Sequence, residues 1–185
     1  MDFVKVYRGI VCPQWCDAMV EMHKDSEGWS NAVCGPDSAY HPEIRNCNVL
    51  DLSDRLMPWH NPTIDAEVFQ AMSAGLTKYI EEFPKLATFV NQDEGYMMMR
   101  YKPGEKVANH IDVGNPDHRV LSCSIQLNDG FEGGRWKFWG EELEGVQKAD
   151  VVVFPSNFCF EHEISEVTSG TRYSILTFFQ SARPR

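Results

Sequence analysis

The sequence lacks any apolar run approaching the roughly 18 residues that a transmembrane helix requires. Positive charge is also scarce: 17 lysines and arginines stand against 27 aspartates and glutamates, and the formal net charge is −10. Such a charge repels phosphate backbones and anionic lipids, so neither nucleic acid nor a membrane is an expected partner. Because the first nine residues carry charges where a signal peptide has its apolar core, we expect a cytoplasmic protein.

The cysteines include no C-x-x-C pair, and the sequence shows no internal repeat, low-complexity tract or linker. A chain of 185 residues, 43% of them hydrophobic, is long enough to bury a core without disulfides. We therefore expect one domain over residues 1–185, with reduced and mostly buried thiols. The thiols belong to Cys12, Cys16, Cys34, Cys47, Cys123 and Cys159.

Hydrophobic spacing predicts two helices in the first half of the chain. Pro13 opens one helix over residues 13–25, and Asn61-Pro62-Thr63 opens a longer one over residues 63–83. The stretch 29–60 between them contains several prolines and is expected to be irregular.

From Glu94 onward, short β-type runs alternate with turn signals such as Asn128-Asp129-Gly130. This spacing leaves little room for crossover helices and favours an antiparallel sandwich or barrel, with the two helices bracing one face. The expected strands are 95–101, 107–112, 119–127, 135–139, 150–154, 158–164 and 171–179.

The strand expected over residues 119–127 alternates apolar and polar side chains. This alternation is typical either of a sheet between a core and water, or of a barrel strand whose polar face lines a binding cavity. Both interpretations remain open from the pattern alone. The apolar set is Leu121, Cys123, Ile125 and Leu127, and the polar set is Ser122, Ser124 and Gln126.

Two histidines and an aspartate suggest a metal site. On the expected strand 107–112, His110 and Asp112 are two residues apart and project from the same face. With His162, they offer the two imidazoles and one carboxylate of the facial triad in non-haem Fe(II) oxygenases. Each histidine taken singly is more typical of a hydrogen-bonded structural residue, and the same three ligands would also satisfy zinc.

Arg172 follows His162 by ten residues and begins the last expected strand. Its planar guanidinium suits the distal carboxylate of a dicarboxylic keto acid that chelates a metal at its other end. The competing interpretation is a surface salt bridge, which would contribute only about 0–1 kcal/mol to stability.

These residues resemble those of the Fe(II)- and 2-oxoglutarate-dependent dioxygenases, in particular the small prolyl 4-hydroxylase-like branch. The resemblance covers most of residues 97–180. Besides the metal and arginine pattern it rests on five segments: Arg45-Asn46-Cys47-Asn48-Val49, Arg100-Tyr101-Lys102-Pro103-Gly104, Leu127-Asn128, Gly133-Gly134-Arg135-Trp136-Lys137-Phe138 and Val167-Thr168-Ser169-Gly170-Thr171-Arg172-Tyr173-Ser174.

The resemblance implies a mainly β protein with α elements (α+β). Its core would be a double-stranded β-helix of the jelly-roll or cupin-like kind, braced by N-terminal helices. Within the single domain, residues 1–93 would form a helical N-terminal support and residues 94–181 the catalytic β core.

The resemblance also implies roles for the site residues. His110, Asp112 and His162 would bind Fe(II), and Arg172 would hold the distal carboxylate of the cosubstrate 2-oxoglutarate. Tyr101 matches a tyrosine that commonly hydrogen-bonds this cosubstrate.

One position departs from the family pattern. Gln126 stands where relatives often carry a tyrosine that assists the arginine. The second contact to the cosubstrate carboxylate is therefore expected from Gln126 itself or from Ser122, Ser124 or Ser174.

The substrate pocket is expected near the aromatic side chains Trp136, Trp139 and Phe178, together with Arg119. The stretch 29–60 and the loop 113–118 are long enough to form a lid over it.

The activity implied by the resemblance is hydroxylation of a prolyl residue in a protein or peptide, with O2 consumed and 2-oxoglutarate converted to succinate and CO2. Ascorbate is a candidate reductant. The alternatives are the same chemistry on a free amino acid, a lysyl residue or an alkylated base, a metal-binding β-barrel without catalysis, and an acidic protein-interaction domain. The oligomeric state is left open by the sequence.

Overall fold

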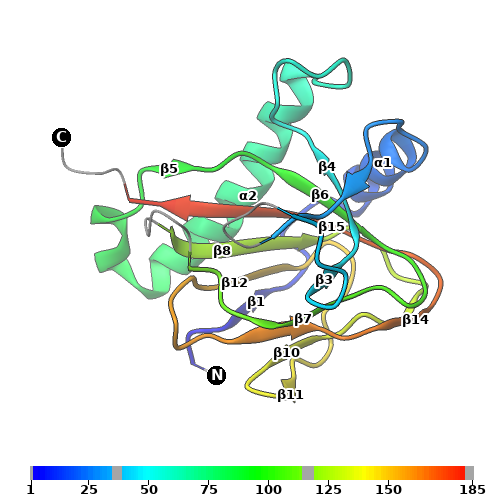
Figure 1. Ribbon diagram of the computed structural model, residues 1–185. Coiled ribbons are helices and arrows are strands. Elements are labelled where there is room, and N and C mark those ends of the chain that lie inside the picture. The colour runs from blue at the N-terminus through cyan, green and yellow to red at the C-terminus, as the bar shows by residue number, and fades with distance from the viewer. Residues whose placement is uncertain (1, 35–38, 114–118, 182–185) are drawn as a thin grey trace.

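The computed structural model describes residues 2–34, 39–113 and 119–181. Two α-helices and a 3-10 turn accompany short strands along the chain (Figure 1). The elements of the first half are β1 (Lys5–Tyr7), α1 (Pro13–His23), β2 (Ser30–Asn31), β3 (Arg45–Asn46), β4 (Asn48–Asp51), α2 (Pro62–Glu82), the 3-10 turn η1 (Pro84–Thr88) and β5 (Gln92–Asp93). The second half contains β6 (Met97–Tyr101), β7 (Lys106–His110), β8 (Arg119–Gln126), β9 (Glu132–Gly133), β10 (Trp136–Phe138), β11 (Glu141–Glu142), β12 (Val151–Pro155), β13 (His162–Ile164), β14 (Val167–Ser169) and β15 (Arg172–Gln180).

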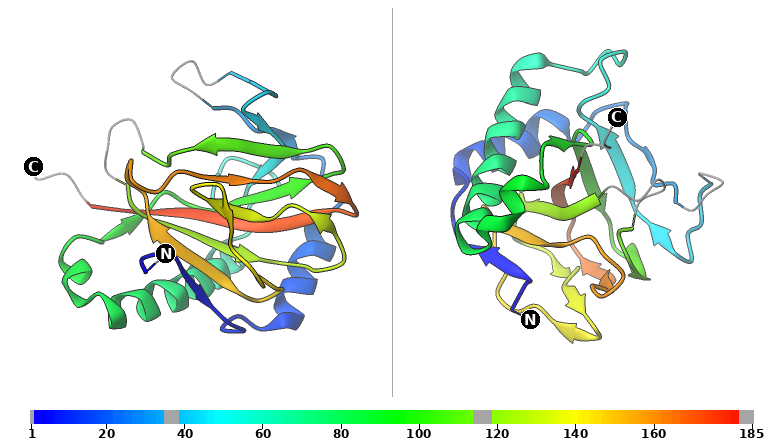
Figure 2. Two further views of the ribbon diagram at one scale, coloured as in Figure 1. Left: turned by 90° about the horizontal axis from the view of Figure 1, so that it is seen from below. Right: turned by 90° about the vertical axis from the view of Figure 1, so that its left-hand side faces the viewer.

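The strands form two main antiparallel sheets. The large sheet has the order β1-β12-β8-β15-β6-β4-β2, with β5 also paired to β15. The small sheet has the order β11-β10-β13-β7-β3, and β14 pairs with β9 beside them. The two sheets face each other, and both helices lie on the far side of the large sheet (Figure 2). This arrangement confirms the expected double-stranded β-helix core with two helices outside its larger sheet.

Strand β8 shows why the sheets are ordered in this way. Its apolar side chains, Leu121, Cys123 and Ile125, are buried in one core cluster with helix residues such as Met19 and Met72. Its polar side chains are buried as well, on the face toward the small sheet. The polar face of this strand therefore points into the sandwich and not into water, although Ser122, Ser124 and Gln126 are not among the residues that line the cavity described below.

A second core cluster fills the space between the two sheets, and some of its members, including Tyr101 and Trp136, also line this cavity. It is rich in aromatic side chains: Phe138 packs edge-on against Phe154 with ring centroids 4.9 Å apart, and Trp136 stacks on Phe138 at 6.0 Å. Such pairs add about 0.5–1.5 kcal/mol each beyond the burial of their area. They fix the spacing of the sheets on which the site residues stand.

The stretch 29–60 is largely irregular, as the sequence pattern suggested, but it also supplies three short strands. It contains β2, β3 and β4, of which β4 pairs with β6 in the large sheet and β3 pairs with β7 at the edge of the small sheet. These strands have two to four residues, and their structure comes from their partners more than from a hydrophobic pattern of their own. Residues 1–93 are thus more than a helical support, because they also supply strands to both sheets.

The cysteines are all free, as expected, but half of them are not buried. Cys16, Cys47 and Cys123 lie in the core. Cys12, at the start of α1, and Cys159 are exposed, and Cys34 is half-buried. Among the described residues, no helix has the length and apolar character needed to cross a membrane.

The helix α2 approaches the large sheet most closely at Gly75. A Cβ atom at this position would lie 2.7 Å from Cγ1 of Val151 on β12, closer than real Cβ contacts come. Val151 is fully buried, and its branched side chain has little rotamer freedom with which to move away. A glycine therefore sets the distance between this helix and the sheet.

We expect Gly75→Ala to destabilise the fold, although alanine favours a helix by about 1 kcal/mol over glycine. Overpacking against Val151 costs about 1–3 kcal/mol, so the net loss should be about 1 kcal/mol in the free energy of unfolding by urea. In a double-mutant cycle with Val151→Ala, the two changes should couple favourably, because the shortened side chain leaves room for the new methyl group. A stabilising Gly75→Ala would show that the helix is free to move outward.

Candidate active site

His110, Asp112 and His162 come together at one end of the sandwich. One ligand atom of each lies within 4.8 Å of the others. The Nε2 atoms of His110 and His162 are each 3.4 Å from an oxygen of the Asp112 carboxylate. Ligands about 2.1 Å from one metal ion and at right angles to each other would be about 3 Å apart. The separation of the three side chains therefore suits a metal ion between them.

A β-bulge turns His110 toward this point. In the pairing of β7 with β13, His110 lies opposite His162 and Val107 opposite Ile164, so β7 has one more residue than its partner over this interval. In a regular strand, residues three positions apart, such as Val107 and His110, would point to opposite faces. The bulge brings both side chains to the same cavity, which is a common use of bulges beside active sites.

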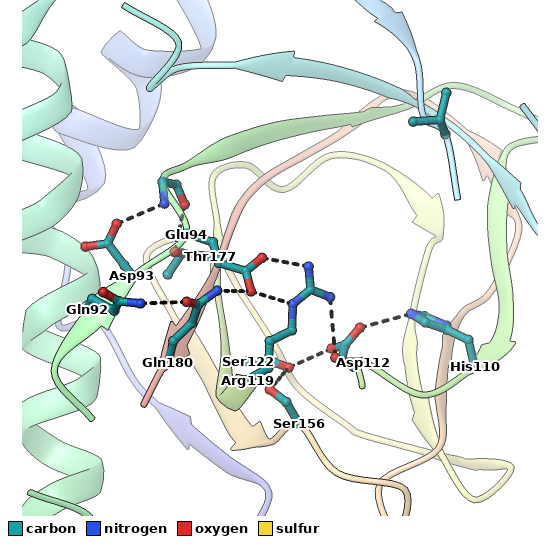
Figure 3. Close-up of polar contacts among 12 residues, drawn as sticks. Gln92, Asp93, Glu94, His110, Asp112, Arg119, Ser122, Ser156, Thr177 and Gln180 are labelled. Carbon is teal, nitrogen blue, oxygen red and sulfur yellow. Dashed lines mark hydrogen bonds and ion pairs between the residues drawn. The ribbon is translucent and has the colours of Figure 1, made fainter. Parts of the chain in front are cut away.

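The sequence pattern predicts Asp112 on the same strand as His110, but the structure places it outside that strand. Strand β7 ends at His110, and the aspartate follows in irregular backbone. Its carboxylate is held instead by the facing sheet: the Ser122 hydroxyl on β8 donates to Oδ2 over 2.6 Å, and Ser122 is hydrogen-bonded in turn to Ser156 over 2.8 Å. The convergence of these groups from separate segments is visible in Figure 3.

Both histidines are oriented by the same local contact. Nδ1 of His110 is 2.9 Å from the carbonyl oxygen of Ala108, and Nδ1 of His162 is 3.0 Å from that of Phe160. A proton on Nδ1 donates to the carbonyl in each case, which leaves the lone pair of Nε2 directed at the site. This is the tautomer that a metal ligand requires.

The pKa shifts of Asp112 and His162 agree with this assignment. Burial alone would raise the pKa of Asp112, but the hydrogen bond and charge of His110, the charge of His162 and the Ser122 hydroxyl lower the pKa to about 2. Burial lowers the pKa of His162. At neutral pH the site therefore presents a carboxylate and a neutral buried imidazole, the forms that coordinate a cation.

Arg172 lies deep in the same region and is only 1% exposed. Its guanidinium carbon is 5.0 Å from the ring centroid of Tyr101 and 5.9 Å from that of Trp136. The NH1 group donates to the Ser174 hydroxyl over 3.1 Å, whereas the buried Nε and NH2 atoms have no hydrogen-bond partner in the described structure. Burial lowers the pKa of Arg172, but a guanidinium stays charged. The surface salt bridge is thus the wrong alternative for this residue.

An orphaned edge of a buried guanidinium fits a carboxylate. Two parallel N–H donors match the two oxygens of a carboxylate. A buried guanidinium without a partner costs free energy, and binding of a carboxylate offsets that cost. Together with two imidazoles and a carboxylate as metal ligands, this edge fits 2-oxoglutarate and Fe(II). Of the expected cosubstrate contacts, Tyr101 also lines the cavity, and burial raises its pKa, so its phenol remains a donor.

The polar residues that were expected to assist Arg172 differ in their contacts, and one of them touches the guanidinium. Ser174 contacts the guanidinium directly, while Ser122 contacts Asp112. Gln126 is buried, but its amide nitrogen donates to the carbonyl oxygens of Asn128 and Tyr173, and neither Gln126 nor Ser124 is among the residues that line the cavity.

A cavity of about 730 Å³ opens beside the triad. Of the residues expected in the substrate pocket, Trp136, Phe178 and Arg119 line it. Trp139 does not: it is 43% exposed, and its indole N–H donates to the carbonyl oxygen of Cys159. Residues 33, 34, 44 and 45 line the cavity from the stretch 29–60, whereas residues 114–118 of the other expected lid lie outside the described residues.

Arg119 is fixed by a pair of ionic hydrogen bonds that the sequence analysis missed. Its Nε and NH2 groups donate to the two carboxylate oxygens of Glu94 over 2.8 and 2.6 Å, and its guanidinium lies 3.5 Å above the ring centroid of Phe178. The NH1 group reaches the carbonyl oxygen of Asp112 at 3.4 Å (Figure 3). Glu94 and Ser156 carry no motif signal, because their partners are far away in the sequence.

We expect Ser122→Ala to weaken iron binding by about 10- to 100-fold, the usual effect of removing a group that orients a metal ligand. The variant leaves the three ligands in place but removes the donor that holds Oδ2 of Asp112. Anaerobic titration with Fe(II) measures the dissociation constant. The matched control is Ser124→Ala, two residues along the same face of β8; equal losses in both variants would contradict the role of Ser122.

Comparisons with known proteins agree with this site. Residues 96–180 match the family model described as the 2OG-Fe(II) oxygenase superfamily. A search of curated proteins finds no sequence that matches this chain.

Solved structures share the whole fold. A prolyl hydroxylase from Trichoplax adhaerens, in complex with a peptide fragment of the hypoxia inducible factor oxygen degradation domain, has a TM-score of 0.77 at 16% identity, covering 98% of this chain and 84% of that one. A prolyl-4-hydroxylase from Pseudomonas putida has a TM-score of 0.73 at 18% identity, covering 98% and 94%. A viral collagen prolyl hydroxylase from Paramecium Bursaria Chlorella virus-1, in its 2OG complex, has a TM-score of 0.70 at 16% identity, covering 97% of both chains.

At these identities the structural likeness establishes the fold, and the family match covers the strands that carry the triad and Arg172. Residues 96–180 thus match the 2OG-Fe(II) oxygenase superfamily, and the His-Asp-His group and the buried arginine in this segment fit the metal and the cosubstrate of 2-oxoglutarate-dependent dioxygenases.

Proposed function

We propose that this enzyme hydroxylates a prolyl residue in a protein or peptide. The observation that carries the proposal is a His-Asp-His group at one cavity together with a buried arginine that has an unpaired edge and lies beside Tyr101 and Trp136 of the cavity wall, on a fold shared with prolyl hydroxylases. One of these, the enzyme from Trichoplax adhaerens, is described in complex with a peptide. That likeness supports a peptide substrate here.

The residues divide the work between binding and orientation. His110, Asp112 and His162 would hold Fe(II), and Arg172 would hold the distal carboxylate of 2-oxoglutarate. When bound, iron and 2-oxoglutarate supply the oxidation of a C–H bond by O2, with succinate and CO2 as products. The protein supplies orientation and a site from which bulk water is excluded.

The walls of the cavity suit an apolar ring. Trp136 and Phe178 are 7% and 4% exposed, and both line the cavity beside the triad. Leu176 and Met97 add aliphatic surface. A pyrrolidine ring has no polar group to satisfy, so contact with such walls is favourable in proportion to the area removed from water.

The non-catalytic alternative does not account for Arg172. A structural zinc site has no need of a buried guanidinium nearby, and an arginine with two orphaned nitrogen atoms would only destabilise such a module. The alternatives within the same chemistry, a free amino acid, a lysyl residue or an alkylated base, are distinguished by experiment.

The test is a coupled assay on purified protein loaded anaerobically with Fe(II) and 2-oxoglutarate. On admission of O2 with prolyl peptides, succinate should form in step with peptides that are heavier by one oxygen atom, as measured by mass spectrometry. Lysyl peptides, free proline and an alkylated oligonucleotide serve as competing substrates. Succinate without any oxidised peptide, or oxidation confined to another substrate class, would contradict the prolyl assignment.

We expect Arg172→Ala to raise the KM for 2-oxoglutarate by about 10- to 150-fold, the equivalent of one or two hydrogen bonds to a charged group. Iron affinity should change far less, because Arg172 does not contact the triad. Steady-state kinetics and Fe(II) titration measure the two quantities separately. A parallel loss of both would mean that the arginine supports the fold of the whole site and has no specific role in cosubstrate binding.

A further inference from the structure

Arg45 lines the cavity as Arg119 does, and no step described so far uses it. It lies on β3, the edge strand of the small sheet, where it is paired with Val107 of β7. Residues directly opposite in neighbouring strands share a face of the sheet. Val107 and Arg45 accordingly both line the cavity, and Arg45 is half-buried there.

The contacts of Arg45 are weak for a guanidinium. Its NH1 group is 3.4 Å from the carbonyl oxygen of Val33, and its NH2 group is 3.6 Å from the thioether sulfur of Met99, a poor acceptor. The nearby Cys47 thiol adds no negative charge, because burial raises its pKa. In the part of the chain that the structure describes, no carboxylate lies within 4.0 Å of Arg45.

This isolation contrasts with the other two arginines. Arg119 is neutralised by the bidentate contact with Glu94, and the orphaned edge of Arg172 is assigned to the cosubstrate. Of the two arginines that line the cavity, Arg45 is the one without an ion pair to any described carboxylate. A half-buried guanidinium has lost part of its hydration, which costs free energy. Binding of an anionic ligand would offset this cost.

We propose that Arg45 binds a carboxylate side chain of the substrate, so that the preferred substrate is an acidic peptide. This proposal rests on the proposed function and specifies its substrate class. The guanidinium matches a glutamate or aspartate side chain through two parallel hydrogen bonds. The overall charge of −10 disfavours anions at long range, so the selectivity comes from this local contact.

The surface around Arg45 suits a peptide better than a free amino acid. Aliphatic side chains on two segments line the cavity and remain exposed: Val33 and Ile44 beside β3 at 48% and 42%, and Ile111 and Val113 beside Asp112 at 43% and 39%. An amino acid bound next to the metal would be too small to cover them. An extended peptide would bury part of this apolar surface on both sides of its reacting residue.

The register sets the position of the acidic residue. Val107, the partner of Arg45, precedes His110 by three residues, or about 10 Å along β7. An extended peptide advances about 3.3 Å per residue. With the reach of the arginine side chain included, the carboxylate should stand about two to four residues from the hydroxylated proline, on one side of it only.

The experiment uses prolyl peptides in which a single glutamate is moved from four residues before the proline to four residues after it. The reference peptide has glutamine at the same position. Anaerobic binding to the protein loaded with Fe(II) and 2-oxoglutarate is measured by fluorescence anisotropy, and kcat/KM is measured after admission of O2. The wild-type protein should favour glutamate over glutamine by about 5- to 20-fold at one position in the expected interval.

In Arg45→Gln, this ratio should fall to about 1. Arg55→Gln, an exposed arginine outside the catalytic cavity, removes the same charge and should keep the wild-type ratio. A wild-type protein without any preference for glutamate, or an Arg45→Gln variant that retains it, would overturn the proposal. A rise in the KM for 2-oxoglutarate in place of a change in the ratio would assign Arg45 to the cosubstrate and overturn it too.

The binding arm separates this proposal from the function on which it rests. If acidic peptides bind in a manner that depends on Arg45 but no proline is oxidised, the prolyl assignment fails and the carboxylate site stands. If prolines are oxidised without regard to acidic neighbours, the prolyl assignment stands and the role of Arg45 is refuted.

Discussion

The carboxylate of Asp112 joins the two sheets of the core. It accepts a hydrogen bond from Ser122 of the large sheet and lies against the imidazoles of His110 and His162, which belong to the small sheet. A buried carboxylate is tolerated only with such partners. The geometry of the metal ligands therefore depends on the distance between the two sheets, which the aromatic cluster between them maintains.

Much of this arrangement could be predicted from the sequence, because it depends on local periodicity. The helices near residues 13–25 and 63–83 and the separation of β8 into an apolar and a polar face follow from it, although both faces of β8 are buried. Strands β3 and β4 did not, since two to four residues carry no period and take their structure from β7 and β6. Short edge strands of this kind are visible only once their partners are known.

The candidate site shows the same division. The ligand types and Arg172 could be recognised from their identity, but their orientation depends on groups remote in the sequence. The bulge that turns His110 inward exists only relative to β13, about fifty residues later, and Ser156 and Glu94 act through partners on other strands. For Gln126, the backbone carbonyl groups that occupy its amide could not be foreseen from the alternation of β8.

The bulge in β7 also gives this protein a latitude over evolutionary time. Loss of one residue between Val107 and His110 would leave the two side chains two residues apart, and the regular alternation of a strand would then keep both on the cavity face. Only the extra bend and twist that a bulge gives a strand would be lost. A relative one residue shorter in this interval can therefore present the same three ligands from a regular strand.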